Sequence, residues 1–111
     1  MPEKNHENLK NCILNPTDLV EYQDGSVVSR MIVYKKTGTI TVFAFDAGEG
    51  LSEHTSPFDA IASIIDGEAE IQIDKNEFTL KVGQMIIMPA NIPHAVKALQ
   101  RFKMMLTMIH E

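Results

Sequence analysis

The chain has 111 residues, 44% of them hydrophobic, which suits one domain with a modest core of its own. Its 15 acidic residues outnumber its 10 basic ones, and the net charge of -5 argues against a nucleic-acid-binding surface. No apolar run is long enough to cross a membrane, and the single Cys12 cannot form an internal disulfide, as expected for a cytoplasmic protein.

The first segment, residues 1–15, is polar, and we expect it to form an arm beside a single domain at residues 16–111. Its opening stretch contains no apolar h-region, so a secretion signal is not expected. His6 in this arm is expected to be solvated. Two turn signals, Asn15-Pro16 and Asp24-Gly25, follow before the first strand.

From Val27 onwards the chain consists of short segments that either alternate between apolar and polar residues or are wholly apolar. The expected strands cover residues 27–34, 39–45, 58–65, 68–74, 78–82, 85–88, 95–99 and 102–109. A loop is expected over residues 48–57, and Asp66-Gly67 is expected to be a turn. Many short strands at regular spacing predict an all-β sandwich or barrel.

Two histidines, His54 and His94, each lie beside such a strand and after a glycine. Imidazoles held on strands of a small barrel can point inward and converge, so this pair is the candidate site. Histidine is also the commonest metal ligand among side chains. The sequence has no phosphate-binding glycine loop, Ser-His-Asp set or paired CxxC, so no catalytic residue can be assigned.

The two histidine segments resemble the paired motifs of the small single-domain cupins. The first motif is matched by Gly48, His54 and Gly67, and the second is matched by Gly83, Pro89 and His94. Fifteen residues separate the two motifs, which is the short spacing of the compact microbial members. The resemblance covers about residues 20–110 and implies a double-stranded β-helix, the jelly-roll barrel.

The resemblance also implies a metal held by two histidines and a glutamate of the first motif and one histidine of the second. Here the second histidine position is Ser56 and the glutamate position is Ala60, so only His54 and His94 carry over as metal ligands. Asp59 adjoins the empty glutamate position, but strand alternation should direct it to the opposite face. We therefore regard Asp59 as a reserve ligand.

Two imidazoles without a carboxylate make a poor cage for a divalent ion. The implied cofactor is a weakly held divalent transition metal, and the sequence does not distinguish Zn, Fe, Mn, Ni or Cu. Two interpretations stay open: a partial metal site completed by waters and a bound carboxylate, or a hydrogen-bonded histidine pair without metal. Glu53 and Ser56 could also reach inward from the same loop. The seven methionines offer soft thioethers that favour copper, although adaptable core filling explains them more simply.

The expected function is to bind a small polar or carboxylate-bearing molecule through this pair. The alternative is a metal-dependent cupin enzyme of the isomerase or dioxygenase type. A third interpretation is a degenerate barrel that serves only to associate with a partner protein or with a second copy of itself. No nucleic-acid or membrane partner is expected. A homodimer is expected, because residues 58–65 and 104–109 are apolar on both faces of their strands.

Overall fold

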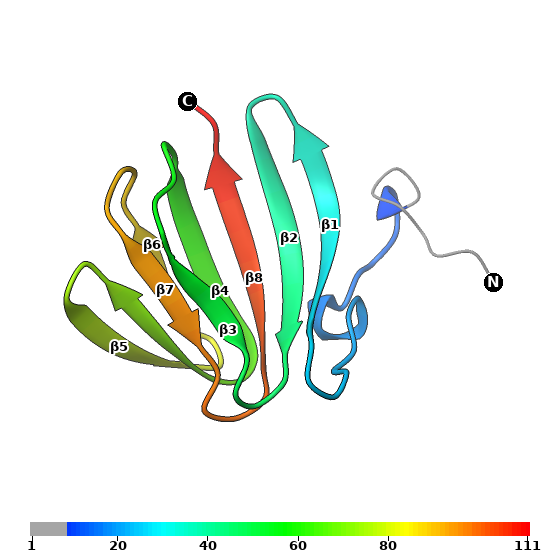
Figure 1. The fold of residues 1–111 in the computed structure, drawn as a ribbon. Helices are drawn as coiled ribbons and strands as arrows, with labels where there is room; N and C mark the ends of the chain where they lie inside the picture. The colour runs from blue at the N-terminus through cyan, green and yellow to red at the C-terminus, as the bar shows by residue number, and fades with distance from the viewer. Residues whose placement is uncertain (1–8) are drawn as a thin grey trace.

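The structure is a computed structural model that describes residues 9–111, and this part of the chain is almost entirely β-structure (Figure 1). The described residues contain no α-helix, and a short 3-10 helix spans Pro16–Asp18. None of the helices in this range has the length and apolarity that a membrane crossing requires. The strands are β1 (Val27–Lys35), β2 (Gly38–Phe45), β3 (Gly50–His54), β4 (Asp59–Ile73), β5 (Asn76–Lys81), β6 (Met85–Met88), β7 (His94–Lys97) and β8 (Phe102–Ile109).

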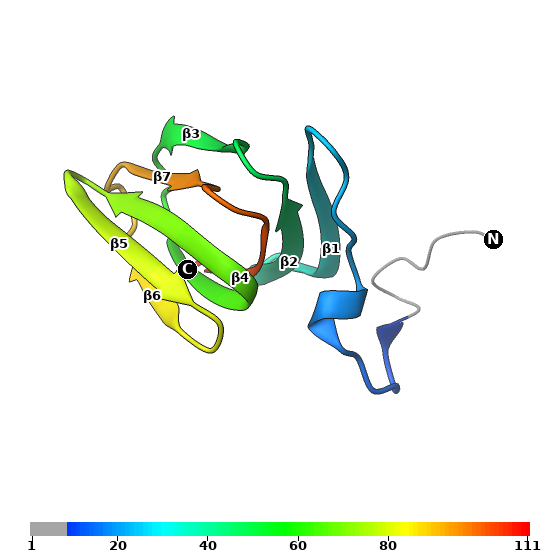
Figure 2. The ribbon, with the colours of Figure 1, turned by 90° about the horizontal axis from the view of Figure 1, so that it is seen from below.

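The strands form two antiparallel sheets that share β4. Sheet A has the strand order β1-β2-β8-β4-β6, and sheet B has the order β3-β7-β4-β5. Seen from below, the two sheets curl around a common interior (Figure 2). The all-β barrel predicted from the strand pattern is therefore confirmed.

β4 differs from the prediction because it continues through Asp66-Gly67, which was expected to be a turn. Its first half pairs with β6 and β8 in sheet A, and its second half pairs with β5 and β7 in sheet B. The register shifts between Ile64 and Asp66, and Gly67 has a φ of 71°. A bulge followed by a left-handed glycine lets one strand pass between sheets without ending, so the turn prediction was wrong.

β3 lies inside the segment 48–57 that was expected to be a loop. It is five residues long, mostly exposed, and pairs with β7 at the edge of sheet B. An exposed edge strand needs no apolar alternation, which is why the sequence pattern does not reveal it. His54 is its last residue.

The core lies between the two sheets and is built around Phe45 and Phe102, whose stacked ring centroids are 4.5 Å apart. Its buried members also include Ala60, Ala62, Ile64, Ala69, Ile71, Leu80, Met88, Val96, Ala98 and Met104. A second cluster of Val20, Val42 and Ala44 forms on the outer face of sheet A, where Leu19 and Tyr22 pack against it. The chain before β1 therefore covers part of that outer face.

The predicted arm at residues 1–15 lies partly outside the described residues, as does His6 within it. In the part that is described, the side chain of Leu9 is buried whereas that of Ile13 is 94% exposed.

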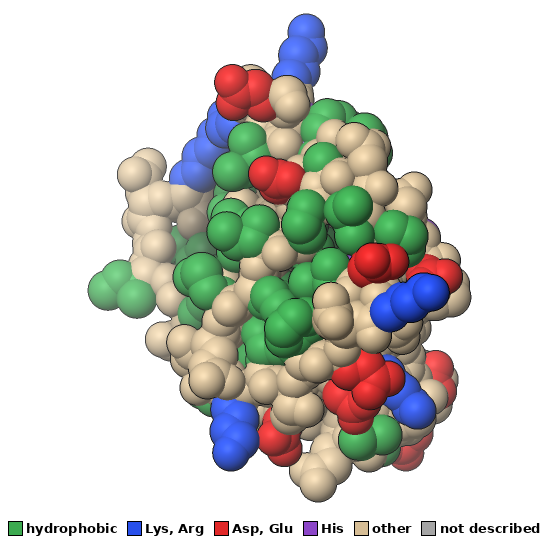
Figure 3. All heavy atoms as spheres, turned by 90° about the vertical axis from the view of Figure 1, so that its left-hand side faces the viewer, with side chains coloured by type: hydrophobic (Ala, Val, Ile, Leu, Met, Phe, Trp, Pro, Cys, Tyr) green, Lys and Arg blue, Asp and Glu red, His purple; other side chains and the backbone are tan. Residues whose placement is uncertain are grey.

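One face of the barrel carries exposed hydrophobic side chains at the edges of β5 and β6 (Figure 3). Among the described strands, β5 and β6 each pair with β4 alone. Phe78 on β5 is 41% exposed, and Met85 and Ile87 on β6 are 66% and 57% exposed. Strand edges without a neighbour, beside apolar side chains, are typical of surfaces that meet another chain.

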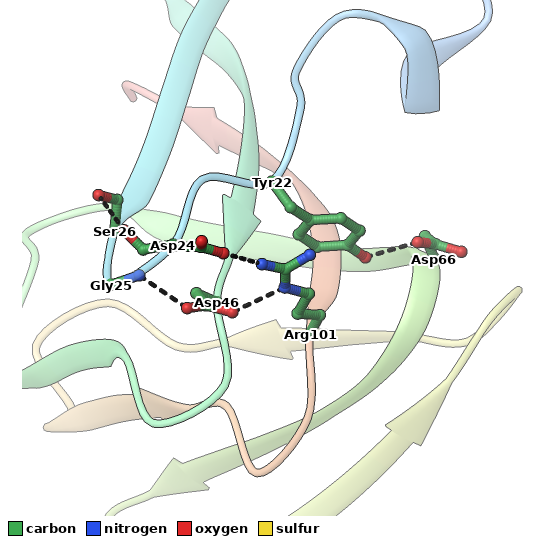
Figure 4. A network of polar contacts seen from close by, with 7 residues as sticks. All are labelled: Tyr22, Asp24, Gly25, Ser26, Asp46, Asp66 and Arg101. Atoms are coloured by element: carbon green, nitrogen blue, oxygen red, sulfur yellow. Dashed lines mark hydrogen bonds and ion pairs between the residues drawn. The ribbon is translucent and has the colours of Figure 1, made fainter.

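A polar network joins the segment before β1 to the barrel (Figure 4). Arg101, between β7 and β8, donates hydrogen bonds to Asp46 at 2.7 Å and to Asp24 at 2.5 Å. Its guanidinium lies 5.4 Å from the centre of the Tyr22 ring, and the Tyr22 hydroxyl donates to Asp66. We call these five residues the Arg101 network.

Candidate functional site

The structure brings His54 and His94 together at one end of the barrel. His54 ends β3, His94 begins β7, and the two residues are register partners in sheet B. Their ring centroids are 4.4 Å apart and their planes meet at 68°, so the rings are in edge-to-face contact. The expected convergence of the two imidazoles is therefore observed.

The two imidazoles differ in exposure. His94 is only 4% exposed, whereas His54 is exposed to solvent. Burial lowers the pKa of His94 below its ordinary value of 6.5, and the neighbouring His54 lowers it further, while a hydrogen bond to the Ile92 carbonyl opposes the shift. His94 is therefore a neutral imidazole at neutral pH.

Main-chain carbonyls determine the tautomer of both rings. Nδ1 of His54 lies 2.7 Å from the Ser52 oxygen, and Nδ1 of His94 lies 3.2 Å from the Ile92 oxygen. A carbonyl oxygen only accepts, so in the neutral ring Nδ1 carries the hydrogen and donates it. Each Nε2 then keeps a lone pair. Orientation through the other ring nitrogen is the usual arrangement of histidines that bind metals.

The positions that hold the other metal ligands in cupins are filled by small side chains. Ser56 is 9% exposed, and its hydroxyl accepts a hydrogen bond from the Phe58 main-chain nitrogen at 3.2 Å. Ala60 is 2% exposed and belongs to the core. Among residues 9–111 no group of three or more histidine, cysteine, aspartate or glutamate side chains is placed to hold a metal ion. The side chains present do not fit the three-histidine, one-glutamate set of the cupins.

The reserve ligand Asp59 is directed away from the interior, as strand alternation predicted. Asp59 is exposed while Ala60 beside it is buried. Its Oδ1 accepts a hydrogen bond from the Ala90 main-chain nitrogen at 2.8 Å, which ties the start of β4 to the loop before β7. Glu53 is also exposed. Among residues 9–111, no carboxylate joins the two imidazoles in a group that could hold a metal ion.

The strand pairing reveals neighbours of this site that sequence reasoning did not assign to it. Ala60 is the register partner of Met88 on β6 and of Met108 on β8. Met88 is 2% exposed, and Met108 packs against the same core. Both methionines lie in segments that were expected to be strands, but no local pattern in the sequence indicates that these strands flank the empty glutamate position.

His110, the described histidine outside the pair, stacks on Phe58. Their ring centroids are 4.3 Å apart, and the His110 main-chain nitrogen donates to the Thr37 carbonyl at 2.8 Å. This contact fixes the end of the chain beside the loop that follows β3.

Comparisons with known proteins agree with this architecture. No curated protein matches the chain. Among solved structures, the conserved SPY1581 protein of unknown function from Streptococcus pyogenes is 38% identical, with a TM-score of 0.86 over 91% of this chain and 89% of that one. A cupin superfamily protein from Desulfitobacterium hafniense is 27% identical, with a TM-score of 0.86 over 92% and 94% of the two chains.

A cupin 2 conserved barrel domain protein from Leptotrichia buccalis is 39% identical over 84% of this chain, with a TM-score of 0.81, and the match spans 45% of that longer protein. The family model of the cupin domain matches residues 41–110, which is more than half of the chain. The jelly-roll barrel implied by the two histidine motifs is thereby confirmed. The chain belongs to the cupin superfamily.

Proposed function

We propose that this cupin binds a small polar or carboxylate-bearing molecule at the end of the barrel where His54 and His94 meet. The observation that supports this proposal is the pair of touching imidazoles whose Nδ1 hydrogens are taken up by carbonyls. Two Nε2 lone pairs are then available to accept hydrogen bonds from hydroxyl or ammonium groups of a ligand, or to bind a metal ion that the carboxylate of the ligand also contacts. Because His54 is exposed, a ligand can reach the pair from solvent.

The same two nitrogen atoms could hold a transition metal weakly. Two protein ligands leave several coordination positions for water and for a bound molecule. A ligand carboxylate would supply the negative charge that Ala60 does not supply in place of glutamate. This is why a carboxylate-bearing ligand suits the site better than a neutral one when a metal is present.

The second candidate is a metal-dependent enzyme of the isomerase or dioxygenase type. The observation in its favour is again the orientation of both imidazoles through Nδ1, which catalytic metal sites share. A metal in this place would act as a Lewis acid. The lack of a carboxylate ligand at Ala60 makes the enzyme the second choice, and a barrel kept for association is the third.

Metal analysis and ligand titration of one protein preparation test the proposal. We expect protein purified without chelators to bind small carboxylates in a titration followed by NMR, with shifts centred on the two histidines. His54→Ala should weaken this binding by about tenfold, since His54 is exposed and its loss should leave the fold intact. His110→Ala, which alters a histidine outside the pair, serves as the matched control.

Unchanged binding in both His54→Ala and His94→Gln would contradict the proposal. A near-stoichiometric transition metal that is lost in His54→Ala, together with turnover of a bound molecule, would favour the enzyme instead. We further propose that the protein is cytoplasmic, in keeping with its single cysteine, and that it acts as a homodimer.

A further inference from the structure

The empty glutamate position is flanked by two thioethers. Ala60 lies between Met88 and Met108 in the register of sheet A. Cross-strand partners point to the same face of a sheet and their side chains lie close together. Ala60 and Met88 are buried in the core between the sheets, and Met108 packs against that core. Two sulfur-bearing side chains therefore lie beside Ala60, the position that corresponds to the glutamate of the cupin motif.

This thioether row and the histidine pair lie at the same end of the barrel. Four residues separate His54, the last residue of β3 in sheet B, from Asp59, where the sheet A half of β4 begins. Met88 ends β6 of sheet A just before the loop that leads to His94. The main-chain hydrogen bond from Asn91 to Ser56, at 2.7 Å, holds these two connecting loops together. Facing sheets are about 10 Å apart, which is within the combined reach of a histidine and a methionine side chain.

The candidate donor atoms at this end of the barrel are all neutral, and two of the four are soft. They are two imidazole nitrogens and two thioether sulfurs, while Asp59 is directed to the other face and accepts a bond from Ala90. A divalent ion in this partly buried place would keep an uncompensated charge, which is costly. Soft thioether ligands favour monovalent copper over hard divalent ions, and imidazole also suits copper.

We propose that this end of the barrel is a Cu(I) site, with His54, His94, Met88 and Met108 as the donor set. The inference rests on the proposed function, because it assumes that the histidine pair is the binding centre. A soft monovalent ion would explain why this site lacks the glutamate of the cupin ligand set, because such an ion does not need a carboxylate ligand.

Anaerobic competition with a chromophoric Cu(I) chelator tests the site. The measurement uses a Cys12→Ser background, since the exposed Cys12 thiol could bind copper independently. We expect one Cu(I) per chain, and X-ray absorption spectra that contain both nitrogen and sulfur scatterers. The affinity for Zn²⁺ in the same buffer should be lower.

Leucine variants separate the thioethers from simple packing, because Met→Leu preserves volume. Met88→Leu with Met108→Leu should lower the Cu(I) affinity by at least about tenfold and remove the sulfur scattering. Met104→Leu is the matched control, since Met104 is equally buried on β8 but pairs with Phe43 and Ile64 instead of Ala60. It should leave the affinity unchanged.

The reciprocal variant Ala60→Glu restores the acid to its usual position. It should raise the affinity for Zn²⁺ and lower that for Cu(I), because a carboxylate is a hard, charged ligand. The expected result is a gain in Zn²⁺ affinity. Partial unfolding could explain a loss of binding but not such a gain.

Three results would overturn the copper site. They are Cu(I) affinity that is unchanged by both leucine substitutions, tighter binding of Zn²⁺ than of Cu(I), or no Cu(I) binding to the unaltered site. In each of these cases, carboxylate binding that still depends on His54 would leave the proposed function standing. Loss of that dependence as well would overturn both.

Discussion

At the scale of single residues, Gly67 shows how tightly the chain is constrained where β4 changes sheets. Its φ of 71° is one that side chains rarely adopt, and an added Cβ would press against the Arg101 carbonyl oxygen and Phe102. Gly25 has a similar φ of 66°, but an added Cβ there would meet nothing within 4 Å. The two glycines thus differ in packing and not in backbone angle.

We predict that Gly67→Ala lowers the free energy of unfolding by more than about 2 kcal/mol, since conformational strain and a main-chain clash add together. Gly25→Ala should lower it by about 1 kcal/mol, the cost of the backbone angle alone. Urea denaturation of both variants measures the difference. Equal losses would mean that the close approach to Arg101 can relax.

The carboxyl of Asp46 gives the fold a dependence on pH. Its hydrogen bond from Arg101 and the main-chain hydrogen bond from Gly25 hold the pKa of Asp46 below its ordinary value of 3.8. A carboxyl whose pKa is lowered by folding stabilises the native state above its unfolded pKa. That contribution is lost as the pH falls below 3.8 towards the folded value.

We therefore predict that Asp46→Asn is less stable than the wild type at neutral pH and that the difference shrinks as the pH falls below 3.8. Thermal unfolding followed by circular dichroism across this range measures the trend. Glu77→Gln, which removes an exposed carboxylate outside the Arg101 network, is the control. A difference that stays constant with pH would contradict the assignment.

At the scale of elements, the segment before β1 is held to the barrel by apolar and polar contacts together. Val20 is 4% exposed in the outer cluster, while Tyr22 donates to Asp66 and packs under Arg101. Burial, with the Asp66 carboxylate as acceptor, raises the pKa of Tyr22 well above its ordinary value. The phenol therefore stays protonated and remains a donor over the whole physiological range.

We predict that Tyr22→Phe lowers the free energy of unfolding by about 1 kcal/mol, the net value of one hydrogen bond. Combining it with Asp66→Asn in a double-mutant cycle isolates the coupling between the two side chains. Most of the loss should appear as that coupling energy. A cycle with additive losses would show that the hydrogen bond does not hold the segment in place.

At the scale of the whole molecule, a mainly apolar, partly exposed row of side chains on the outer face of sheet A supports the proposed homodimer. Ile87 on β6, Ile61 on β4, Thr107 on β8 and Ile40 on β2 are successive register partners along the outer face of sheet A. These side chains come from the two segments predicted to be apolar on both faces and from their neighbours. Ile87 and Met85, both on β6, are 57% and 66% exposed.

We predict a dimer at micromolar concentration in light scattering, and a monomer after Ile87→Glu, because a buried unpaired carboxylate is costly. Leu99→Glu is the matched control: Leu99 is 64% exposed, close to the 57% of Ile87, but lies in the loop between β7 and β8. The control should remain dimeric. A monomeric wild type would refute the dimer, and a dimeric Ile87→Glu variant would place the contact elsewhere.

The sequence predicted most of the strands and the convergence of His54 and His94. It did so because period-two patterns and the two glycine–histidine motifs are local signals. The prediction from sequence missed β3, whose exposed residues do not alternate between apolar and polar. It was wrong at Asp66-Gly67, because a bulge and a turn can have the same residue composition. Both failures concern short segments whose conformation depends on strands distant in sequence.

The sequence by itself determined that the chain is a β-barrel with a histidine in each of two motifs and no acid at position 60, because these facts follow from residue identity and local spacing. Only the tertiary structure decided that Met88 and Met108 flank Ala60, and that Nδ1 of each histidine meets a carbonyl. Strand order joins segments nearly fifty residues apart, and their partners are selected by the packing of the whole sheet. No local pattern in the sequence indicates which strands pair with one another.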